Sequence, residues 1–144
     1  MAEIKKSRQS RIEKITPADH HHQVVSVAGG GHEYRKSPCK SCPWRTSQVG
    51  TFPAQAFRIS AHTAYDMADR TFGCHESGHK KPSTCAGFLL RGADHNLAVR
   101  LGKAKGRYLD VLNADGAELF DSYREMAVAN GVEPSDPVLT LCRN

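Results

Sequence analysis

The sequence contains no long apolar run. Nowhere do its 144 residues reach about eighteen consecutive apolar side chains, the length that a helix needs to cross a membrane. The first residues are basic and no apolar segment follows them, so we expect no secretory signal. We therefore expect a cytoplasmic protein, in which cysteines bind metal more often than they form disulfides.

Apolar and aromatic side chains are also scarce. Hydrophobic residues make up 39% of the chain and aromatic residues 7%, and the mean hydropathy is −0.52. The length suits one ordinary domain, but this composition gives it a lean hydrophobic core. A bound metal would compensate for such a core, because the free energy of binding at a structural metal site is also free energy of folding.

The complete motifs of several enzyme classes are missing as well. Gly29-Gly30-Gly31 is not followed by the Lys-Ser/Thr pair of a phosphate-binding loop. Pro38–Cys42 matches half of the zinc deaminase signature, but no His-x-Glu supplies the catalytic half. Asp94-His95-Asn96 has the residue types of a His/Asn nuclease, yet we expect His95 on a helix without a catalytic partner. We therefore favour a non-enzymatic protein and assign no catalytic residue.

What the sequence does have is four cysteines in two pairs. Cys39 and Cys42 are separated by two residues in a turn of lysine, serine and proline, which is poor material for a core. Cys74 and Cys85 form a second pair with ten residues between them. Four thiolates are the ligand set of structural zinc sites and of iron–sulfur clusters. The spacing therefore predicts one metal site formed by all four cysteines, in preference to four buried apolar thiols.

The sequence leaves the identity of the metal open. Zn²⁺ suits a Cys-x2-Cys turn joined by a distant second pair, and we favour it. A 4Fe-4S cluster is the alternative, because Pro43 directly follows a candidate ligand and Trp44 can shield a cluster from water. His75 and His79 are candidate ligands or supporting groups, although polar loop residues are the simpler interpretation. Cys142 stands alone near the C-terminus and is expected to be a bystander thiol.

The pattern along the chain predicts a flexible basic tail over residues 1–22 and a single domain over residues 23–144. The tail combines basic side chains with few apolar anchors. For the domain we expect a small, mostly helical α+β fold, stapled by the four-cysteine site. Its first elements are a strand at 24–27, a helix over about 53–70 and a metal-bearing loop over 72–87.

The second half of the domain is predicted to contain two more helices. The first runs from about 87 to 103, and a break at Gly92 is foreseen because glycine costs about 1 kcal/mol relative to alanine in a helix. A strand at 108–112 follows. Asp115 is expected to cap the last helix, and Gly131 lies just past its end. An irregular tail completes the chain.

The charges are distributed unevenly over the domain. Residues 79–107 carry seven basic residues and one acidic residue, whereas residues 108–144 carry two basic and seven acidic residues. Mutual pairing or a solvated surface would explain both groups. A nucleic-acid interface would explain the basic group, because cations that contact phosphates cluster in this way. The candidate phosphate contacts are Lys80, Lys81, Arg91, Arg100, Lys103, Lys105 and Arg107.

Three short motifs in combination resemble an uncharacterised family of small phage and prophage proteins. They are Cys39-x2-Cys42-Pro43-Trp44-Arg45, Phe72-Gly73-Cys74-His75 and Cys85-Ala86-Gly87-Phe88-Leu89. The resemblance covers about residues 38–97. It implies a phage or mobile-element origin, hence a host cell cytoplasm, and a four-cysteine metal site at Cys39, Cys42, Cys74 and Cys85. It carries no established activity.

These observations favour a non-enzymatic, metal-stabilised binding protein that acts on nucleic acid or on a host nucleoprotein complex. One alternative is a protein–protein inhibitor of a host defence or transcription machine. Its acidic face would consist of Asp115, Glu118, Asp121 and Glu125. The other alternative is an iron–sulfur redox sensor or enzyme, which would be coloured when purified anaerobically.

Overall fold

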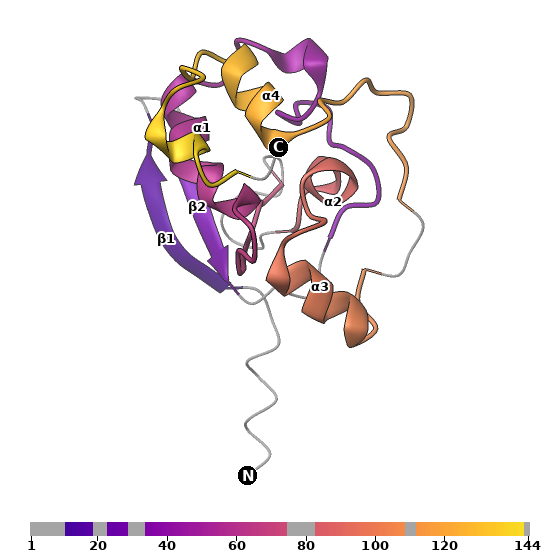
Figure 1. The fold of residues 1–144 in the computed structure, drawn as a ribbon. Coiled ribbons are helices and arrows are strands. Elements are labelled where there is room, and N and C mark those ends of the chain that lie inside the picture. Colours follow the sequence, from indigo (N-terminus) through magenta and orange to yellow (C-terminus); the bar gives the residue numbers. More distant parts are fainter. Residues whose placement is uncertain (1–10, 19–22, 29–33, 75–82, 109–111, 143–144) are drawn as a thin grey trace.

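The computed structural model describes residues 11–18, 23–28, 34–74, 83–108 and 112–142. These residues form a small α+β arrangement of one antiparallel sheet and several short helices, as expected from the sequence. The β1–β2 hairpin lies on one side of the molecule and α2 and α3 lie on the other (Figure 1). No helix among the residues just listed has the length and apolar character needed to cross a membrane.

The sheet has the strand order β1-β2-β3, from Arg11–Pro17, Gln23–Ala28 and Arg70–Thr71. Both neighbouring pairs are antiparallel. β2 contains the predicted strand at 24–27, but β1 lies inside the segment that was predicted to be a tail. That prediction was wrong for residues 11–17. The segment contains β-branched Ile12, Ile15 and Thr16 among its charged residues, and its backbone pairs along the whole of β2.

The first predicted helix ends earlier than expected. α1 spans Ala54–Ser60 and continues as a 3-10 helix over Ala61–Ala64, instead of reaching residue 70. The chain then becomes extended at Tyr65, and Met67 adopts a left-handed conformation with φ of 62°. This turn redirects the backbone so that it can form β3 beside β2. Phe57, Ala61 and Ala64 bury their side chains from the two helical segments, and the helix does not continue beyond them.

The second predicted helix is broken where the sequence foresaw a break. α2 spans Ala86–Arg91 and ends at Gly92, and α3 spans Leu97–Ala104. Asn96 begins α3, because its side-chain oxygen accepts a hydrogen bond from the Val99 amide at 3.0 Å. Asn96 is also almost fully buried and donates to the Arg70 carbonyl at 2.7 Å, so the start of α3 is attached to the sheet.

The last helix, α4, spans Tyr123–Ala129 and begins later than predicted. Ser122 caps it instead of Asp115, which lies in a turn with φ of 52°. Gly131 follows the end of the helix with φ of 105°, as the sequence indicated. Of the strand predicted at 108–112, only the two ends lie within the described residues; Tyr108 is buried with φ of 57° and belongs to no strand.

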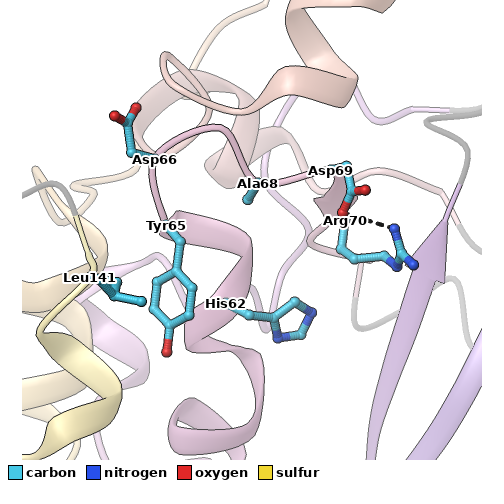
Figure 2. A pocket seen from close by; sticks show the side chains of 7 residues that line it. All are labelled: His62, Tyr65, Asp66, Ala68, Asp69, Arg70 and Leu141. Atoms are coloured by element: carbon cyan, nitrogen blue, oxygen red, sulfur yellow. Dashed lines mark ion pairs between the residues drawn. The ribbon is translucent and has the colours of Figure 1, made fainter.

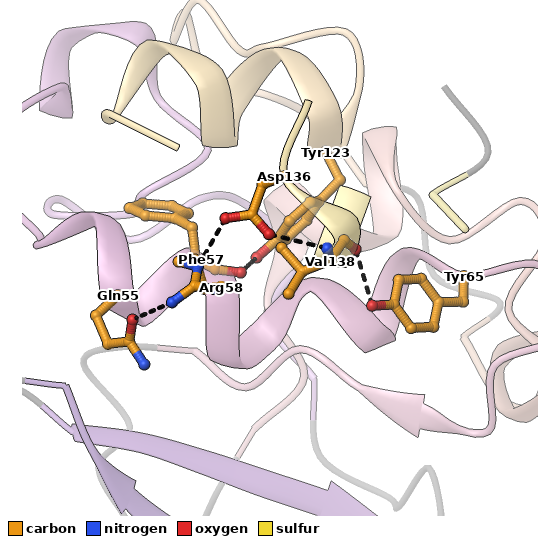
Figure 3. A network of polar contacts seen from close by, with 7 residues as sticks. All are labelled: Gln55, Phe57, Arg58, Tyr65, Tyr123, Asp136 and Val138. Carbon is orange, nitrogen blue, oxygen red and sulfur yellow. Dashed lines mark hydrogen bonds and ion pairs between the residues drawn. The ribbon is translucent and has the colours of Figure 1, made fainter. Parts of the chain in front are cut away.

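A network of hydrogen bonds joins α1, α4 and the C-terminal segment (Figure 3). Buried Tyr123 donates from its hydroxyl to the Phe57 carbonyl at 2.6 Å, and the same hydroxyl lies 2.6 Å from that of Ser60. Tyr65 donates to the Val138 carbonyl at 2.8 Å. We call this set of contacts the tyrosine network. It fixes the C-terminal segment, which was predicted to be an irregular tail, against α1.

Candidate metal centre and basic helix

The first cysteine pair lies in a tight turn. The Cys42 amide donates to the Cys39 carbonyl at 3.1 Å, and the Arg45 amide donates to the Cys42 carbonyl at 3.0 Å. Arg45 also closes the turn with its side chain, because its guanidinium donates to the carbonyls of Cys39 and Pro38 at 2.8 and 3.0 Å. These bonds hold the two thiols in fixed positions relative to one another.

The second pair lies on two short antiparallel segments. The Cys74 amide donates to the Ser83 carbonyl at 2.6 Å, and the Cys85 amide donates to the Phe72 carbonyl at 2.9 Å. Cys85 is also the residue before the first turn of α2. The intervening residues 75–82, which include the candidate ligands His75 and His79, lie outside the described parts of the chain.

All four thiols are buried, with exposed fractions of 6%, 0%, 5% and 2% for Cys39, Cys42, Cys74 and Cys85. The sulfur atoms of Cys42 and Cys85 are 3.5 Å apart, although 43 positions separate the two residues in the sequence. A hydrogen bond with Cys39 lowers the pKa of Cys42, but the neighbouring Cys85 and burial raise that pKa more, so it lies above its ordinary value. In the absence of a cation, Cys42 is therefore a neutral thiol at pH 7.

The separation of 3.5 Å between these sulfur atoms can be compared with the distances in a disulfide and in a zinc site. A disulfide would bring the atoms to about 2.0 Å. Two thiolates on one tetrahedral zinc, with Zn–S distances of about 2.3 Å, lie about 3.8 Å apart. The observed value excludes the first geometry and is compatible with the second, and it is equally the distance of an S–H···S contact between two buried thiols. Within the described residues, however, no three His, Cys, Asp or Glu side chains are arranged closely enough to be recognised as a metal-binding group. The four-ligand site thus remains a prediction.

Trp44 forms the apolar wall of this region. Its side chain is fully buried and packs against α2, where a Cβ atom at Gly87 would lie 2.6 Å from the Trp44 Cβ and 3.1 Å from the Cys42 sulfur. The other end of the indole lies against Gly92 in the same way, at 2.6 Å. Two glycines thus allow α2 to approach the indole and the cysteines closely. We call residues 38–45, 72–74 and 83–92 the cysteine region.

Cys142 is remote from the cysteine region. It is buried in the C-terminal segment, where its sulfur lies 3.8 Å from the Ala61 carbonyl oxygen and its backbone pairs with Tyr65. Burial raises the pKa of this thiol above its ordinary value. The residue has a packing role against α1, which the sequence pattern did not indicate.

The structure divides the predicted basic residues into three groups. Lys80 and Lys81 lie outside the described residues. Arg91 forms an ion pair with Asp121 at 2.8 Å. Arg100, Lys103 and Lys105 are exposed on α3 and at its end, and within the described chain none of them has an ion pair. Arg107 is half-buried just beyond them.

The predicted acidic face is partly engaged in contacts of its own. Asp121 pairs with Arg91, and the Glu118 carboxylate accepts a hydrogen bond from the Thr46 hydroxyl at 3.1 Å. Asp115 and Glu125 are exposed, in a turn and in the first turn of α4 respectively. Asp121 therefore pairs with a member of the basic group, as expected if the two groups partly neutralise each other.

An open pocket with a volume of about 340 Å³ and a mostly apolar lining was not predicted from the sequence (Figure 2). It lies where the 3-10 helix 61–64, β3 and the C-terminal segment meet. The residues that line it are His62, Tyr65, Asp66, Ala68, Asp69, Arg70 and Leu141. His95, which was expected on a helix, lies instead between α2 and α3, where its carbonyl accepts a hydrogen bond from the Met67 amide. All of the lining residues except Leu141 lie within residues 62–70, but this stretch was assigned to a continuous helix from the sequence, so the pocket was not predicted.

The fold thus defines a class: small α+β proteins in which one cysteine from each of two pairs meets the other beside a buried tryptophan. Comparison with family models places the chain more closely. It belongs to a family of unknown function, DUF6283, whose model matches residues 34–143. The match includes both cysteine pairs, α1 to α4 and the C-terminal segment. No curated protein and no solved structure matches the chain significantly.

Proposed function

We propose that the protein is a metal-stapled binding module in which Cys39, Cys42, Cys74 and Cys85 hold one Zn²⁺. The close approach of the Cys42 and Cys85 sulfur atoms, at 3.5 Å, carries this part of the proposal. Four buried thiols fit a closed site that needs no open coordination position. Arg45 supports the site by fixing the first turn and by placing a positive charge near thiolates that would carry negative charge.

A purified sample tests the metal directly. Elemental analysis is expected to find one zinc per chain, and the visible spectrum is expected to show no absorption band. A brown protein with iron and sulfide would replace zinc by the 4Fe-4S cluster and favour the redox alternative. A fully folded protein without any metal would overturn this part of the proposal.

The binding surface is the basic end of α3, and its ligand is nucleic acid. The observation that carries this step is the set of exposed cations Arg100, Lys103 and Lys105, which lack ion pairs within the described chain. Arg100 and Lys103 are three positions apart and therefore neighbours on one face of the helix. Cations on one helix face match the spacing of a phosphate backbone and give binding that weakens steeply with salt.

A charge-reversal experiment tests this surface. The double variant Arg100→Glu/Lys103→Glu is expected to lose most nucleic-acid affinity at low salt and to show a shallower dependence on salt. Arg91→Gln is the matched control, because Arg91 is already paired with Asp121 and its loss should change affinity little. Equal losses in both variants would mean that the whole basic segment acts without a defined site. Absence of affinity in the wild-type protein at low salt would overturn the proposal.

The same proposal includes a phage or prophage origin, for which the short motifs around the cysteines are the support. In that setting the natural ligand would be host nucleic acid or a nucleoprotein complex in the host cytoplasm. Capture from nuclease-treated host lysate distinguishes the protein–protein inhibitor. A partner that survives nuclease and is lost on reversing exposed Glu125 would replace nucleic acid by a protein partner for the acidic face.

A further inference from the structure

The pocket beside the 3-10 helix has two aromatic side chains in fixed orientations. His62 lies on this helix and Tyr65 is the extended residue directly after its end, and both side chains line the pocket. The Nδ1 of His62 lies 3.0 Å from the Ile59 carbonyl, and the Tyr65 hydroxyl donates to the Val138 carbonyl. Figure 2 shows both rings at the pocket, between Leu141 and the Asp69–Arg70 pair. The pocket therefore has a preformed surface against which a planar ring can stack.

Polar groups of both signs surround these rings. Arg70 and Asp69 form an ion pair at 2.8 Å on one side of the pocket, and exposed Asp66 lies on its rim. Because the Ile59 carbonyl can only accept, Nδ1 of His62 donates to it, which leaves Nε2 for a ligand. Donors and acceptors around flat apolar surfaces match the chemistry of a nucleobase, which has polar edges and π-faces. Two carboxylates among the lining residues disfavour a simple anion as the occupant.

The loop that forms the pocket carries strain and exposed apolar surface. Met67 adopts φ of 62°, which is rare for a long unbranched side chain. Left-handed conformations of residues other than glycine cluster at ligand sites. Met67 itself does not line the pocket, but its neighbours Asp66 and Ala68 do. Leu141, which does line it, has a side chain that is 64% exposed and that a bound ring would cover.

Two backbone hydrogen bonds attach the pocket loop to the start of the basic helix. The Met67 amide donates to the His95 carbonyl at 2.9 Å, and the Leu97 amide donates to the Ala68 carbonyl at 2.6 Å. Since an α-helix rises about 1.5 Å per residue, Lys103 lies about 9 Å along α3 from Leu97. About three stacked nucleotides of one strand span that distance.

We infer that this pocket is a subsite for one unpaired nucleobase, so that the ligand of the protein is a single-stranded nucleic acid. The base stacks on Tyr65 and His62, and the adjoining phosphates follow α3 toward Arg100 and Lys103. The inference rests on the proposed nucleic-acid function and names its substrate class. It also accounts for a volume of about 340 Å³, near the lower end of ligand pockets and suited to a single base with its sugar.

The test compares Tyr65→Leu with Tyr65→Phe in the metal-loaded, full-length protein. Both variants lose the hydrogen bond to Val138, but only the leucine variant loses the ring. The probes are fluorescein-labelled single-stranded DNA and RNA of about twelve nucleotides, within the known range of single-strand site sizes, and a DNA duplex of equal length. Tyr65→Leu is expected to weaken single-strand binding about tenfold, whereas Tyr65→Phe stays close to wild type. Duplex binding should change in neither variant.

A second variant protects the test against misfolding. Leu141→Glu places a negative charge at the rim of the pocket on a largely exposed side chain, so folding should tolerate it. It is expected to weaken single-strand binding more than duplex binding. If all probes bind with equal affinity to all variants, the subsite does not exist while the basic surface on α3 stands. If no probe binds even to the wild-type protein, the proposed function itself is overturned.

Discussion

The cysteine region and the tyrosine network are held together in different ways. In the tyrosine network, buried hydroxyls and carbonyls are satisfied by hydrogen bonds between distant parts of the chain, such as Tyr123 to Phe57 at 2.6 Å. In the cysteine region, Trp44 Nε1 and Thr84 Oγ1 are buried without a hydrogen bond of good geometry to the described residues. An unsatisfied buried donor or acceptor costs about 1–3 kcal/mol. The first region is thus fixed by hydrogen bonds of its own, whereas the second packs against it through the Tyr123 ring, whose centroid lies 6.0 Å from that of Trp44 and 6.4 Å from that of Phe72.

The difference between the two regions indicates where a metal would act in this fold. The tyrosine network anchors α1, α4 and the C-terminal segment, and the four thiols lie outside it. A metal at the cysteines would therefore stabilise the part of the molecule that holds unsatisfied polar atoms. Experiments that disable one region at a time can separate these two sources of stability.

The largest effect is expected from removing a central cysteine. Cys42→Ser and Cys85→Ser should each abolish stoichiometric zinc and cooperative thermal unfolding, because binding at structural zinc sites contributes about 10–16 kcal/mol in small domains. Elemental analysis and circular dichroism on heating measure the two results. Cys142→Ser is the matched control, since Cys142 is a buried thiol remote from the site. Zinc retained in Cys42→Ser would show that the four cysteines are not one site.

A smaller but substantial effect is expected from filling the space between α2 and Trp44. Gly87→Ala places a methyl group 2.6 Å from the Trp44 Cβ and 3.1 Å from the Cys42 sulfur. Overpacking of this kind reduces the free energy of unfolding by about 1–3 kcal/mol, and the rate of zinc loss to a chelator should rise with it. Gly50→Ala serves as the control. It meets no atom within 4 Å and has only the cost of its left-handed backbone. A chelation rate that is the same in both variants would uncouple α2 from the thiols.

The tyrosine network should respond without any change in metal content. Tyr123→Phe leaves the Phe57 carbonyl and the Ser60 hydroxyl without their buried partner, which should lower the free energy of unfolding by about 1–3 kcal/mol. Tyr65→Phe removes a less buried hydroxyl and should cost about 1 kcal/mol. Urea denaturation of the zinc-loaded protein measures both changes. Zinc loss in Tyr123→Phe would mean that the two regions are not separate sources of stability.

The smallest effect is expected at Asp136, beside the tyrosine network, where the free energy of unfolding should depend on pH. The Val138 amide, and then the Arg58 guanidinium, hold the pKa of Asp136 below its ordinary value. A carboxyl with a lowered pKa stabilises the folded state above its unfolded pKa, and the contribution disappears as the pH falls through the folded pKa. Asp136→Asn should therefore be less stable than wild type at pH 7 and differ less at about pH 3. Asp94→Asn, on an exposed carboxylate, is the control. A difference that stays constant with pH would exclude this linkage.

The sequence predicted elements best where one local signal determines the backbone. Gly92 broke a helix because it lacks a Cβ, and Gly131 followed the end of α4 because it tolerates a positive φ. The α+β class was predicted from one short strand and from several segments with the apolar periodicity of a helix. Pairing between strands could not be predicted from one segment alone. β1 forms because it pairs with β2, whereas its charged residues had suggested a tail.

The candidate site was predictable only in part for the same reason. Cysteine spacing indicated which residues belong together, and Cys42 and Cys85 do approach each other. The tyrosine network depends instead on contacts between segments far apart in the sequence, such as Tyr65 with Val138, and the pocket gains Leu141 from the same C-terminal segment. Nothing within either segment signals such a contact. The pairing of Arg91 with Asp121 likewise appears only in the fold, and it removes one cation from the basic surface.

The attachment of the C-terminal segment to α1 constrains the order in which the chain can fold during synthesis. Arg124 donates to the carbonyls of Leu139 and Cys142, and the Cys142 backbone pairs with Tyr65 at the end of the 3-10 helix. A ribosome must therefore polymerise about eighty further residues after Ala61 before the partner of that helix exists. Until then the 3-10 helix lacks its C-terminal partner, whereas α1 already has its contacts with β2. A nascent chain stalled before residue 137 should accordingly remain sensitive to protease near residues 61–65, whereas one released after residue 142 should not.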